Sequence, residues 1–264
     1  MSSNPLRVAV LGAAGRVGLE ICRGVLEAND LTLVGAVDPR NAGKSLSELG
    51  IESDLTIVAS VGDLDGEGVD AAVDFTVLDA ARANLAWAAE RGVHMVVGTT
   101  GFTEEDLEGV RQTFVDSNCI IAPNFSLGAI LMMRFAEMAA PFFESAEILE
   151  FHHENKIDAP SGTAMMTAQR MAAASSDWMD DPTTNEVLPG ARGGEGPQGI
   201  RVHGVRMKGT AANQEVILGT AGQTLTIRHD TIDRTSYVPG VLLALRGVGE
   251  RPGLTLGLDD VLGL

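Results

Sequence analysis

A glycine-rich turn between an apolar strand and a helix constrains the fold of this 264-residue chain more than any other feature. Residues Leu6–Leu11 form a short apolar run, GAAGRVG follows at 12–18, and residues 17–27 are apolar at helical spacing. A second apolar run, Leu31–Val37, ends at Asp38. Together these segments have the size of one βαβ unit. The GxxGxxG spacing differs by one residue from the common GxGxxG, yet its glycines permit the same tight turn, and the helix behind it offers N–H groups to a pyrophosphate.

The carboxylate of Asp38 makes a dinucleotide the favoured ligand of this turn. A glycine motif alone also fits a strand–helix turn that binds nothing, but Asp38 ends the second strand, where a carboxylate can accept hydrogen bonds from the adenosine ribose. The predicted contacts are Gly12, Ala13, Ala14, Gly15, Arg16, Val17 and Asp38. Asp38 repels a 2′-phosphate and so favours NADH, whereas Arg16 or Arg40 could pair with that phosphate. Arg40 is equally well explained as a solvated surface residue.

Strands and helices alternate through the rest of the first half, which predicts an α/β, Rossmann-type domain with a parallel sheet and helices on both faces. Strands are expected at Thr56–Ala59, Ala71–Thr76, Val93–Val97 and Cys119–Ala122, and helices at Ala80–Arg91 and from Thr103 onward. Ligands of such sheets bind beyond the carboxyl ends of the strands. The strand-end residues expected to contact the cofactor are Phe75, Gly98, Thr99, Thr100, Ala122, Pro123, Asn124 and Phe125.

The pattern changes after residue 126 and predicts a second, α+β domain on an open mixed sheet. Helices are expected at Leu127–Phe143 and Thr163–Ser175, strands at Glu147–His153, Ile200–Lys208, Asn213–Gly219 and Gln223–Asp230, and a long loop at 176–199. A helix at Pro239–Arg246 and a short tail are expected to return to the first domain. The predicted boundaries are 1–126 with 239–264 for the cofactor domain, and 127–238 for a domain that binds substrate and pairs between subunits through its open sheet.

The clearest chemical signal is the segment EFHHENKIDAPSGTA at 150–164. It places the adjacent histidines His152 and His153, and then Lys156, at the exit of a predicted strand. The N–H groups of Gly162 and Thr163 open the following helix and can face an anion. One short stretch thus combines a proton donor near neutral pH, a fixed positive charge and an anion-binding helix end. We expect it to bind a small carboxylate substrate and to protonate it.

Other interpretations of this segment are a zinc site and a structural pair of histidines. A zinc site is disfavoured because no cysteine and no HExxH spacing lie nearby, so no metal is expected. The structural pair stays open, because clustered titratable groups indicate function only in a statistical sense.

The composition narrows the class of protein and its partners. A formal net charge of −17 argues against nucleic acid and against anionic membranes. No apolar run reaches the roughly 18 residues that span a bilayer. The N-terminal sequence lacks a charged segment followed by an apolar stretch, and Cys22 and Cys119 fit two reduced thiols. A cytoplasmic protein is expected.

Several motifs resemble those of the dihydrodipicolinate reductase family in its actinobacterial form. They are the glycine turn, GTTGF at 98–102, APNFS at 122–126 and E-x-HH-x-x-K-x-DAPSGTA at 150–164. Later segments such as VHGVRMKG at 202–209 and DRTSYVPGVLLALR at 233–246 are also similar, so the resemblance covers nearly the whole chain. It implies NAD(P)H-dependent reduction of 4-hydroxy-tetrahydrodipicolinate to tetrahydrodipicolinate in the diaminopimelate route to lysine, a homotetramer, and use of both NADH and NADPH.

The resemblance also implies roles for single residues. His152 matches the proton donor of the family, Lys156 matches the second catalytic residue, and His153, Gly162 and Thr163 match substrate-binding positions. The predicted cofactor-binding region departs from the family in two places. Ala14 stands where some related enzymes carry lysine, and Pro39 stands where many carry arginine, so a strong preference for NADPH is not expected.

Two rival functions stay open on the sequence. One is a different two-domain NAD(P)-dependent dehydrogenase, and the other is an NAD(P)-binding redox sensor without turnover. An enzyme acting on a semialdehyde would need a nucleophilic cysteine, and neither Cys22 nor Cys119 has a neighbouring histidine in the sequence. The His–Lys segment argues against a sensor.

Overall fold

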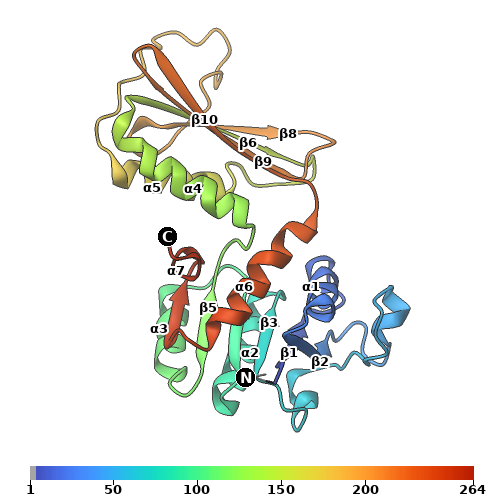
Figure 1. Cartoon of the computed structure of the whole chain (residues 1–264). Coiled ribbons are helices and arrows are strands. Elements are labelled where there is room, and N and C mark those ends of the chain that lie inside the picture. The colour runs from blue at the N-terminus through green and yellow to red at the C-terminus, as the bar shows by residue number, and fades with distance from the viewer. Residues whose placement is uncertain (1–3) are drawn as a thin grey trace. The chain divides into compact units, whose positions relative to one another are not determined.

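The computed structural model describes residues 4–264, and its internal contacts divide the chain into two compact units (Figure 1). Unit 1 comprises the chain up to Ser126 together with Arg234–Leu264, and unit 2 comprises Leu127–Asp233. The first three residues of the predicted 1–126 segment lie outside the described residues. No helix in the described part of the chain is both long and apolar enough to cross a membrane.

Unit 1 is built on a six-stranded sheet in which every pairing is parallel. Its strands are β1 (Leu6–Leu11), β2 (Leu31–Val37), β3 (Ala71–Asp74), β4 (His94–Val97), β5 (Asn118–Ile121) and β11 (Gly253–Leu256). Helices α1 (Arg16–Glu27) and α6 (Val238–Val248) pack on one face, and α2 (Leu78–Arg91) and α3 (Glu104–Thr113) on the other (Figure 1). Coverage of both faces explains why the strands are continuous apolar runs rather than alternating ones.

The strand order of this sheet is β11-β5-β4-β3-β1-β2, and the direction in which strands are added reverses at β1. From β1 the chain adds β2 on one side and then returns to add β3, β4 and β5 on the other. Sheets of this kind bind ligands in the crevice beyond the carboxyl ends of the strands at such a reversal. The predicted α/β, Rossmann-type fold is therefore confirmed, and its ligand edge lies where β1 and β3 end.

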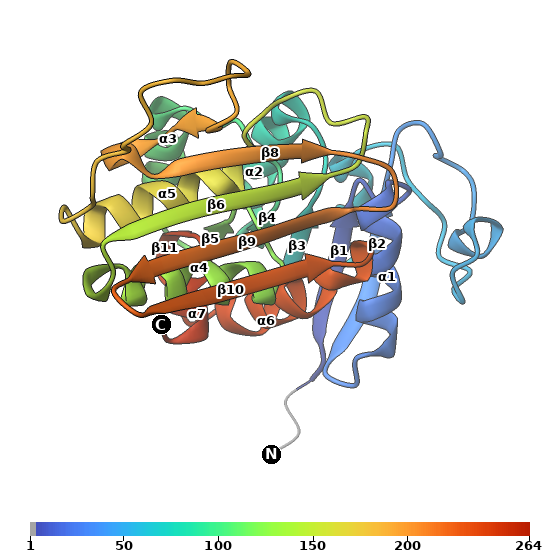
Figure 2. The ribbon, with the colours of Figure 1, turned by 90° about the horizontal axis from the view of Figure 1, so that it is seen from above.

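Unit 2 is a mixed five-stranded sheet in the order β10-β9-β6-β8-β7. Its strands are β6 (Ser145–His152), β7 (Gly194–Glu195), β8 (Arg201–Arg206), β9 (Ala212–Thr220) and β10 (Gln223–Thr231). Helices α4 (Leu127–Ala139) and α5 (Gly162–Ala174) cover one face, and in Figure 2 the face turned toward the viewer carries no helix. The covered face forms a core in which Ile148, Val216 and Leu218 meet Ala168 and Met171 of α5.

Three predicted elements need correction, and the tail adds a strand that was not expected. The expected strand Thr56–Ala59 makes only isolated bridges, Ser45 with Thr56 and Val37 with Val58. The helix expected at Leu127–Phe143 ends at Ala139, because Pro141, the second residue of the short 3₁₀ turn Ala140–Phe142, has no N–H to donate a helical hydrogen bond. The expected loop at 176–199 contains β7 and a 3₁₀ turn. The tail contributes β11, which pairs with β5 at the edge of the sheet.

Short elements complete the described chain. They are the 3₁₀ helices Leu46–Leu49, Val61–Leu64, Ala140–Phe142, Pro197–Gly199 and Arg234–Tyr237, and helix α7 (Asp259–Leu262).

Candidate active site

The glycine turn of unit 1 has a backbone that only glycine fits. Gly12 has a φ of 80°, and a Cβ atom there would lie 2.5 Å from the carbonyl oxygen of Phe75. A Cβ atom on Gly18 would lie 2.1 Å from the carbonyl oxygen of Gly12. The N–H groups of Gly12 and Ala13 donate to the carbonyl of Val37 at 2.8 and 3.0 Å. The turn is therefore fixed between the ends of β1, β2 and β3, with the first turn of α1 packed directly behind it.

The N-terminus of α1 is suited to an anion. Its N-cap is Gly15, which makes no side-chain capping bond, and no acidic residue lies in the first turn. The first N–H groups of any helix lack partners within the helix, and the helix dipole gives them partial positive charge. A pyrophosphate meets these requirements.

Asp38 is half-buried where β2 ends, and the turn that follows holds its carboxylate. One oxygen of that carboxylate accepts hydrogen bonds from the backbone N–H of Arg40 at 3.0 Å and from Nδ2 of Asn41 at 3.2 Å. The side chains of Arg16 and Arg40 are exposed. The carboxylate of Asp38 and the guanidinium of Arg40 thus lie in the same turn after β2. The hydrogen bond between these two residues uses the backbone N–H of Arg40 and not its guanidinium.

A buried carboxylate organises the other loops of this edge. Asp74, the last residue of β3, is fully buried. It accepts hydrogen bonds from Oγ1 of Thr99 at 2.8 Å, Oγ1 of Thr76 at 2.7 Å and Nδ2 of Asn84 at 2.7 Å. It therefore ties together the ends of β3 and β4 and helix α2. The signal available in the sequence was an aspartate ending an otherwise apolar strand.

Two of the predicted strand-end residues, Gly98 and Phe125, pack against the ring of Phe75. Its centroid lies 5.5 Å from that of Phe125, with 57° between the ring planes. A Cβ atom on Gly98 would lie 2.3 Å from the Phe75 ring, so Gly98 permits this packing. Thr99 and Ala122 are buried, whereas Thr100 and Pro123 are exposed. Loops after β3, β4 and β5 thus meet at one place, with Asn124 half-buried among them.

His152, at the end of β6, is hydrogen-bonded to a fully buried glutamate. Its Nδ1 lies 2.5 Å from Oε2 of Glu150, and its own side chain is 16% exposed. Burial lowers the pKa of His152 below its ordinary value, and the carboxylate of Glu150 opposes that shift. Because Nδ1 faces Glu150, Nε2 is the ring nitrogen left to exchange a proton with a ligand.

Glu150 is anionic because several donors surround it. Burial alone would raise its pKa, but hydrogen bonds from Arg206 and His152 outweigh burial, and the pKa of Glu150 is lowered. Arg206 Nη1 and Nη2 donate to its two oxygens at 2.9 and 2.8 Å, and the N–H of Ser161 donates at 3.3 Å. Neither Glu150 nor Arg206 had a predicted role. Side chains two positions apart on a strand point to the same face, so the spacing of Glu150 and His152 could have indicated that they pair.

Lys156 and the start of α5 follow on the next loop. Nζ of Lys156 lies 2.8 Å from both carboxylate oxygens of Asp158, which keeps the pKa of Asp158 below its usual value. Ser161 caps α5 by accepting from the N–H of Ala164 at 3.2 Å. His153 is exposed, as is Gly162 in the first turn of the helix. In unit 2 the predicted cation, histidines and helix N-terminus all lie within one strand-to-helix connection.

Neither cysteine has the environment of a nucleophile. Cys22 and Cys119 are buried, and burial raises the pKa of Cys22 to about 12 and that of Cys119 still further. Their thiols therefore stay protonated at neutral pH, which disfavours the chemistry of a semialdehyde dehydrogenase.

Comparison with known proteins gives matches over nearly the full chain. Residues 6–125 match the family model described as "Dihydrodipicolinate reductase, N-terminus", and residues 128–262 match "Dihydrodipicolinate reductase, C-terminus". A 4-hydroxy-tetrahydrodipicolinate reductase of Cutibacterium acnes is 48% identical, covering 98% of this chain and 99% of its own. The corresponding protein of Nocardia farcinica is 49% identical with the same coverage.

A solved structure with a similar fold comes from Paenisporosarcina sp. TG-14 and is described as a dipicolinate-bound dihydrodipicolinate reductase. It has a TM-score of 0.86 and 36% identity, and covers 97% of this chain and 99% of its own. An amine dehydrogenase from Mycobacterium smegmatis has a TM-score of 0.62 at 14% identity, which shows a shared fold alone.

Proposed function

Because this chain belongs to the dihydrodipicolinate reductase family, we propose that His152 and Lys156 carry out the protonation and the substrate binding of the family reaction. That reaction is the reduction of 4-hydroxy-tetrahydrodipicolinate to tetrahydrodipicolinate in lysine biosynthesis, and it uses a nicotinamide cofactor. The observation that carries the proposal is the arrangement of a buried His–Glu pair, a lysine and a helix N-terminus within one connection of unit 2. The high identity to named reductases sets aside the rival dehydrogenase and the sensor.

The residues at the ligand edge of unit 1 fit a dinucleotide. Gly12 leaves space that a Cβ atom would fill, and the N-terminus of α1 has no side-chain cap. We assign the pyrophosphate to residues 12–17, the adenosine ribose to Asp38, and the nicotinamide half to the loops around Phe75. When bound, the cofactor supplies a hydride. NADH and NADPH are both accepted, because Asp38 favours a free ribose while Arg16 and Arg40 can pair with a 2′-phosphate.

Substrate binding is assigned to unit 2. A net charge of −17 repels a dicarboxylate at long range, so nearby groups must supply the affinity. Lys156 pairs with one substrate carboxylate by exchanging its bonds to the exposed Asp158 for bonds to the ligand. The first N–H groups of α5, at Gly162 and Thr163, together with His153, hold substrate oxygens.

The proton is assigned to Nε2 of His152. The 4-hydroxyl of the substrate leaves as water to give the unsaturated ring, and reduction adds a hydride and a proton to that ring. Addition of the hydride places negative charge on the ring until the proton arrives. Lys156 stabilises that charge, and Nε2 of protonated His152 releases its proton to it. Nδ1 keeps its hydrogen bond to Glu150 throughout, so the histidine ends the step neutral and in place.

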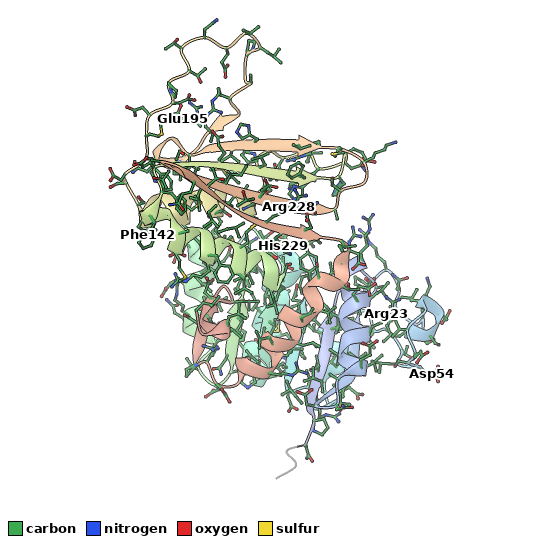
Figure 3. The ribbon with its side chains drawn as sticks, turned by 45° about the horizontal axis from the view of Figure 1, so that its top comes forward. Arg23, Asp54, Phe142, Glu195, Arg228 and His229 are labelled. Atoms are coloured by element: carbon green, nitrogen blue, oxygen red, sulfur yellow. The ribbon has the colours of Figure 1, made fainter. Side chains whose placement is uncertain are left out.

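A homotetramer is proposed, with unit 2 as the assembly domain. The face of its sheet without helices carries Leu149, Phe151, Val205 and Ile217, all partly exposed apolar residues on strand positions that alternate with buried ones. Arg228 on β10, labelled in Figure 3, lies with its guanidinium 5.6 Å from the centre of the Phe151 ring on this face. An open sheet with such a face is well suited to pairing with another copy.

The experiment that tests the proposed function follows oxidation of NADH and NADPH with freshly made synthase product. We expect turnover with both cofactors and competitive inhibition by dipicolinate, a planar mimic of the ring. Lys156→Ala should lose inhibition by dipicolinate, while its affinity for NADH stays unchanged. Tight dipicolinate binding to Lys156→Ala would show that this segment is not the carboxylate site.

A further inference from the structure

Glu150 is the only fully buried glutamate among the described residues, and three separate elements donate to it. We propose that Glu150 is a positioning residue, which fixes the tautomer and orientation of His152 and ties that ring to the N-terminus of α5. The inference deepens the proposed function, because it rests on His152 as the proton donor.

The tautomer follows from the charge of the partner. An ionised carboxylate only accepts hydrogen bonds, so Nδ1 of His152, 2.5 Å from Glu150, must carry the hydrogen. Neutral His152 therefore has a bare Nε2, and protonated His152 carries its transferable proton there. A ring free to turn would present either nitrogen to the substrate.

Arg206 on β8 completes the arrangement. It donates to both oxygens of Glu150, and Nη2 also donates to the backbone carbonyl of Asp158 at 2.6 Å. The second oxygen of Glu150 accepts from the N–H of Ser161, the N-cap of α5. One carboxylate thus links the proton donor, the loop bearing Lys156 and the helix end assigned to the substrate carboxylate. Their relative positions depend on it.

The same strand offers a matched control. Glu147 lies three residues earlier on β6, and strand alternation places it on the opposite face from Glu150. It also contacts one histidine and one arginine: Nε2 of His203 at 2.6 Å and Nη2 of Arg192 at 2.7 Å. Each glutamate thus pairs with one histidine and one arginine, but Glu147 faces Nε2 of its histidine, whereas Glu150 faces Nδ1.

The direct test is ¹⁵N NMR of the imidazole nitrogens in the wild-type apoprotein, with each of the five histidines assigned by single His→Gln variants. Above its pKa, His152 should be the Nδ1–H tautomer, whereas His203 should be the Nε2–H tautomer. Glu150→Gln should leave His152 as a mixture of tautomers, and Glu147→Gln should leave His152 unchanged. A wild-type Nε2–H tautomer at His152 overturns the inference without any variant.

Kinetics separate positioning from structural support. Glu150→Gln should lower kcat at least tenfold in the wild-type background but by a much smaller factor in the His152→Gln background, because Glu150 acts mainly through that ring. Additive losses overturn the inference. If His152→Gln itself keeps wild-type kcat, the proposed function fails instead. Glu147→Gln should keep wild-type kcat.

The pH profile gives an independent readout. His152 faces Glu150, which raises its pKa, and Lys156 and Arg206, which lower it. Activity needs the protonated ring, so it falls as pH rises through this pKa. Without the carboxylate the pKa is lower, and the fall should begin at lower pH in Glu150→Gln. If that variant is poorly folded, Glu150→Gln/Arg206→Gln removes the unpaired charge and should show a smaller displacement in the same direction, because Arg206 itself lowers the pKa of His152 by less than Glu150 raises it. An unchanged profile in a folded variant contradicts the role.

Discussion

At the scale of single residues, each unit organises its functional loops around one fully buried carboxylate. Asp74 in unit 1 and Glu150 in unit 2 are both 0% exposed. A buried charge is tolerated only when donors satisfy it, and each of these accepts from at least three groups. Phe75 and His152, which are expected to touch ligands, stand one and two positions after these acids. We therefore expect the buried acids to position the proposed ligand-binding residues rather than bind ligands themselves.

Residue types that carry chemistry could be predicted from the sequence, whereas their partners could not. His152 and Lys156 belong to a short segment whose composition indicates protonation and anion binding. Arg206 lies 56 residues from Glu150, and the two meet only because β6 and β8 pair in parallel with His152 opposite Arg206. Local sequence does not specify that register.

The predicted use of both NADH and NADPH can be tested at Asp38. Asp38→Ala should weaken use of NADH more than use of NADPH, because the change removes a ribose acceptor and also a like charge near the 2′-phosphate. The comparison requires kcat/KM for both coenzymes in wild type and variant. A wild-type preference of about a thousandfold in either direction, roughly 4 kcal/mol, would contradict dual use.

Lys156 and Thr163 should separate binding from charge stabilisation. Lys156→Ala should raise KM and lower kcat together, because the ammonium holds substrate and also meets charge that develops after hydride addition. Charge-assisted hydrogen bonds contribute roughly 1.5–3 kcal/mol each, so a rise in KM of tenfold or more is expected. Thr163→Ala should mainly raise KM. Equal effects of both variants on kcat would contradict the assignment of charge stabilisation to Lys156 and of binding alone to Thr163.

At the scale of elements, the glycine turn shows how backbone geometry shapes the proposed cofactor site. The turn and its two flanking strands are predictable, because only glycine tolerates the required approach. Other elements could not be predicted from the sequence, because they depend on pairing with neighbouring strands. β7 has two residues and is held by one neighbour, and β11 gains its stability by adding to β5 at the sheet edge. Residues 56–59 are of types common in strands, but they form only two isolated bridges and no continuous strand pairing.

Gly12 and Gly50 form a matched pair for testing the turn. Their φ angles are 80° and 79°, but a Cβ atom on Gly50 would meet nothing within 4 Å. Gly50→Ala should cost only the backbone strain, about 1–2 kcal/mol, with unchanged NADH affinity. Gly12→Ala should weaken NADH at least tenfold, measured by fluorescence titration of the folded variant. Equal NADH affinity in the two variants would show that the turn does not cradle the cofactor.

At the scale of the whole molecule, partly buried histidines contribute to the response to acid. Burial lowers the pKa values of His94, His152 and His229 below the ordinary 6.5. Because the unfolded chain then binds protons more readily, their contribution to stability is complete above pH 6.5 and is lost as pH falls through the folded-state values. His94 illustrates the cause, since its Nδ1 accepts from the N–H of Asn118 at 3.0 Å and must be unprotonated to do so.

The corresponding measurement is the urea midpoint between pH 8 and pH 5. The midpoint should be constant from pH 8 to about pH 7 and should fall toward pH 5. His94→Gln should flatten the fall, because glutamine does not titrate. A midpoint that rises on acidification would contradict the assigned pKa directions.

Assembly is the second property of the whole molecule. Light scattering after size exclusion should give four times the chain mass of 27.6 kDa. Ile217→Glu, on the sheet face without helices, should reduce that mass, because a charge at a desolvated apolar contact is unfavourable. A monomeric wild-type protein, or a variant with wild-type mass, would contradict the proposed interface.

The most direct test of the central claim is the turnover of His152→Gln. Glutamine keeps a polar side chain but cannot supply a proton near neutral pH. We predict that kcat falls by roughly 10²–10⁴-fold, the usual contribution of a general acid, while the dissociation constants of NADH and dipicolinate change little. Wild-type kcat in this variant would contradict the account, because the proton would then come from another group.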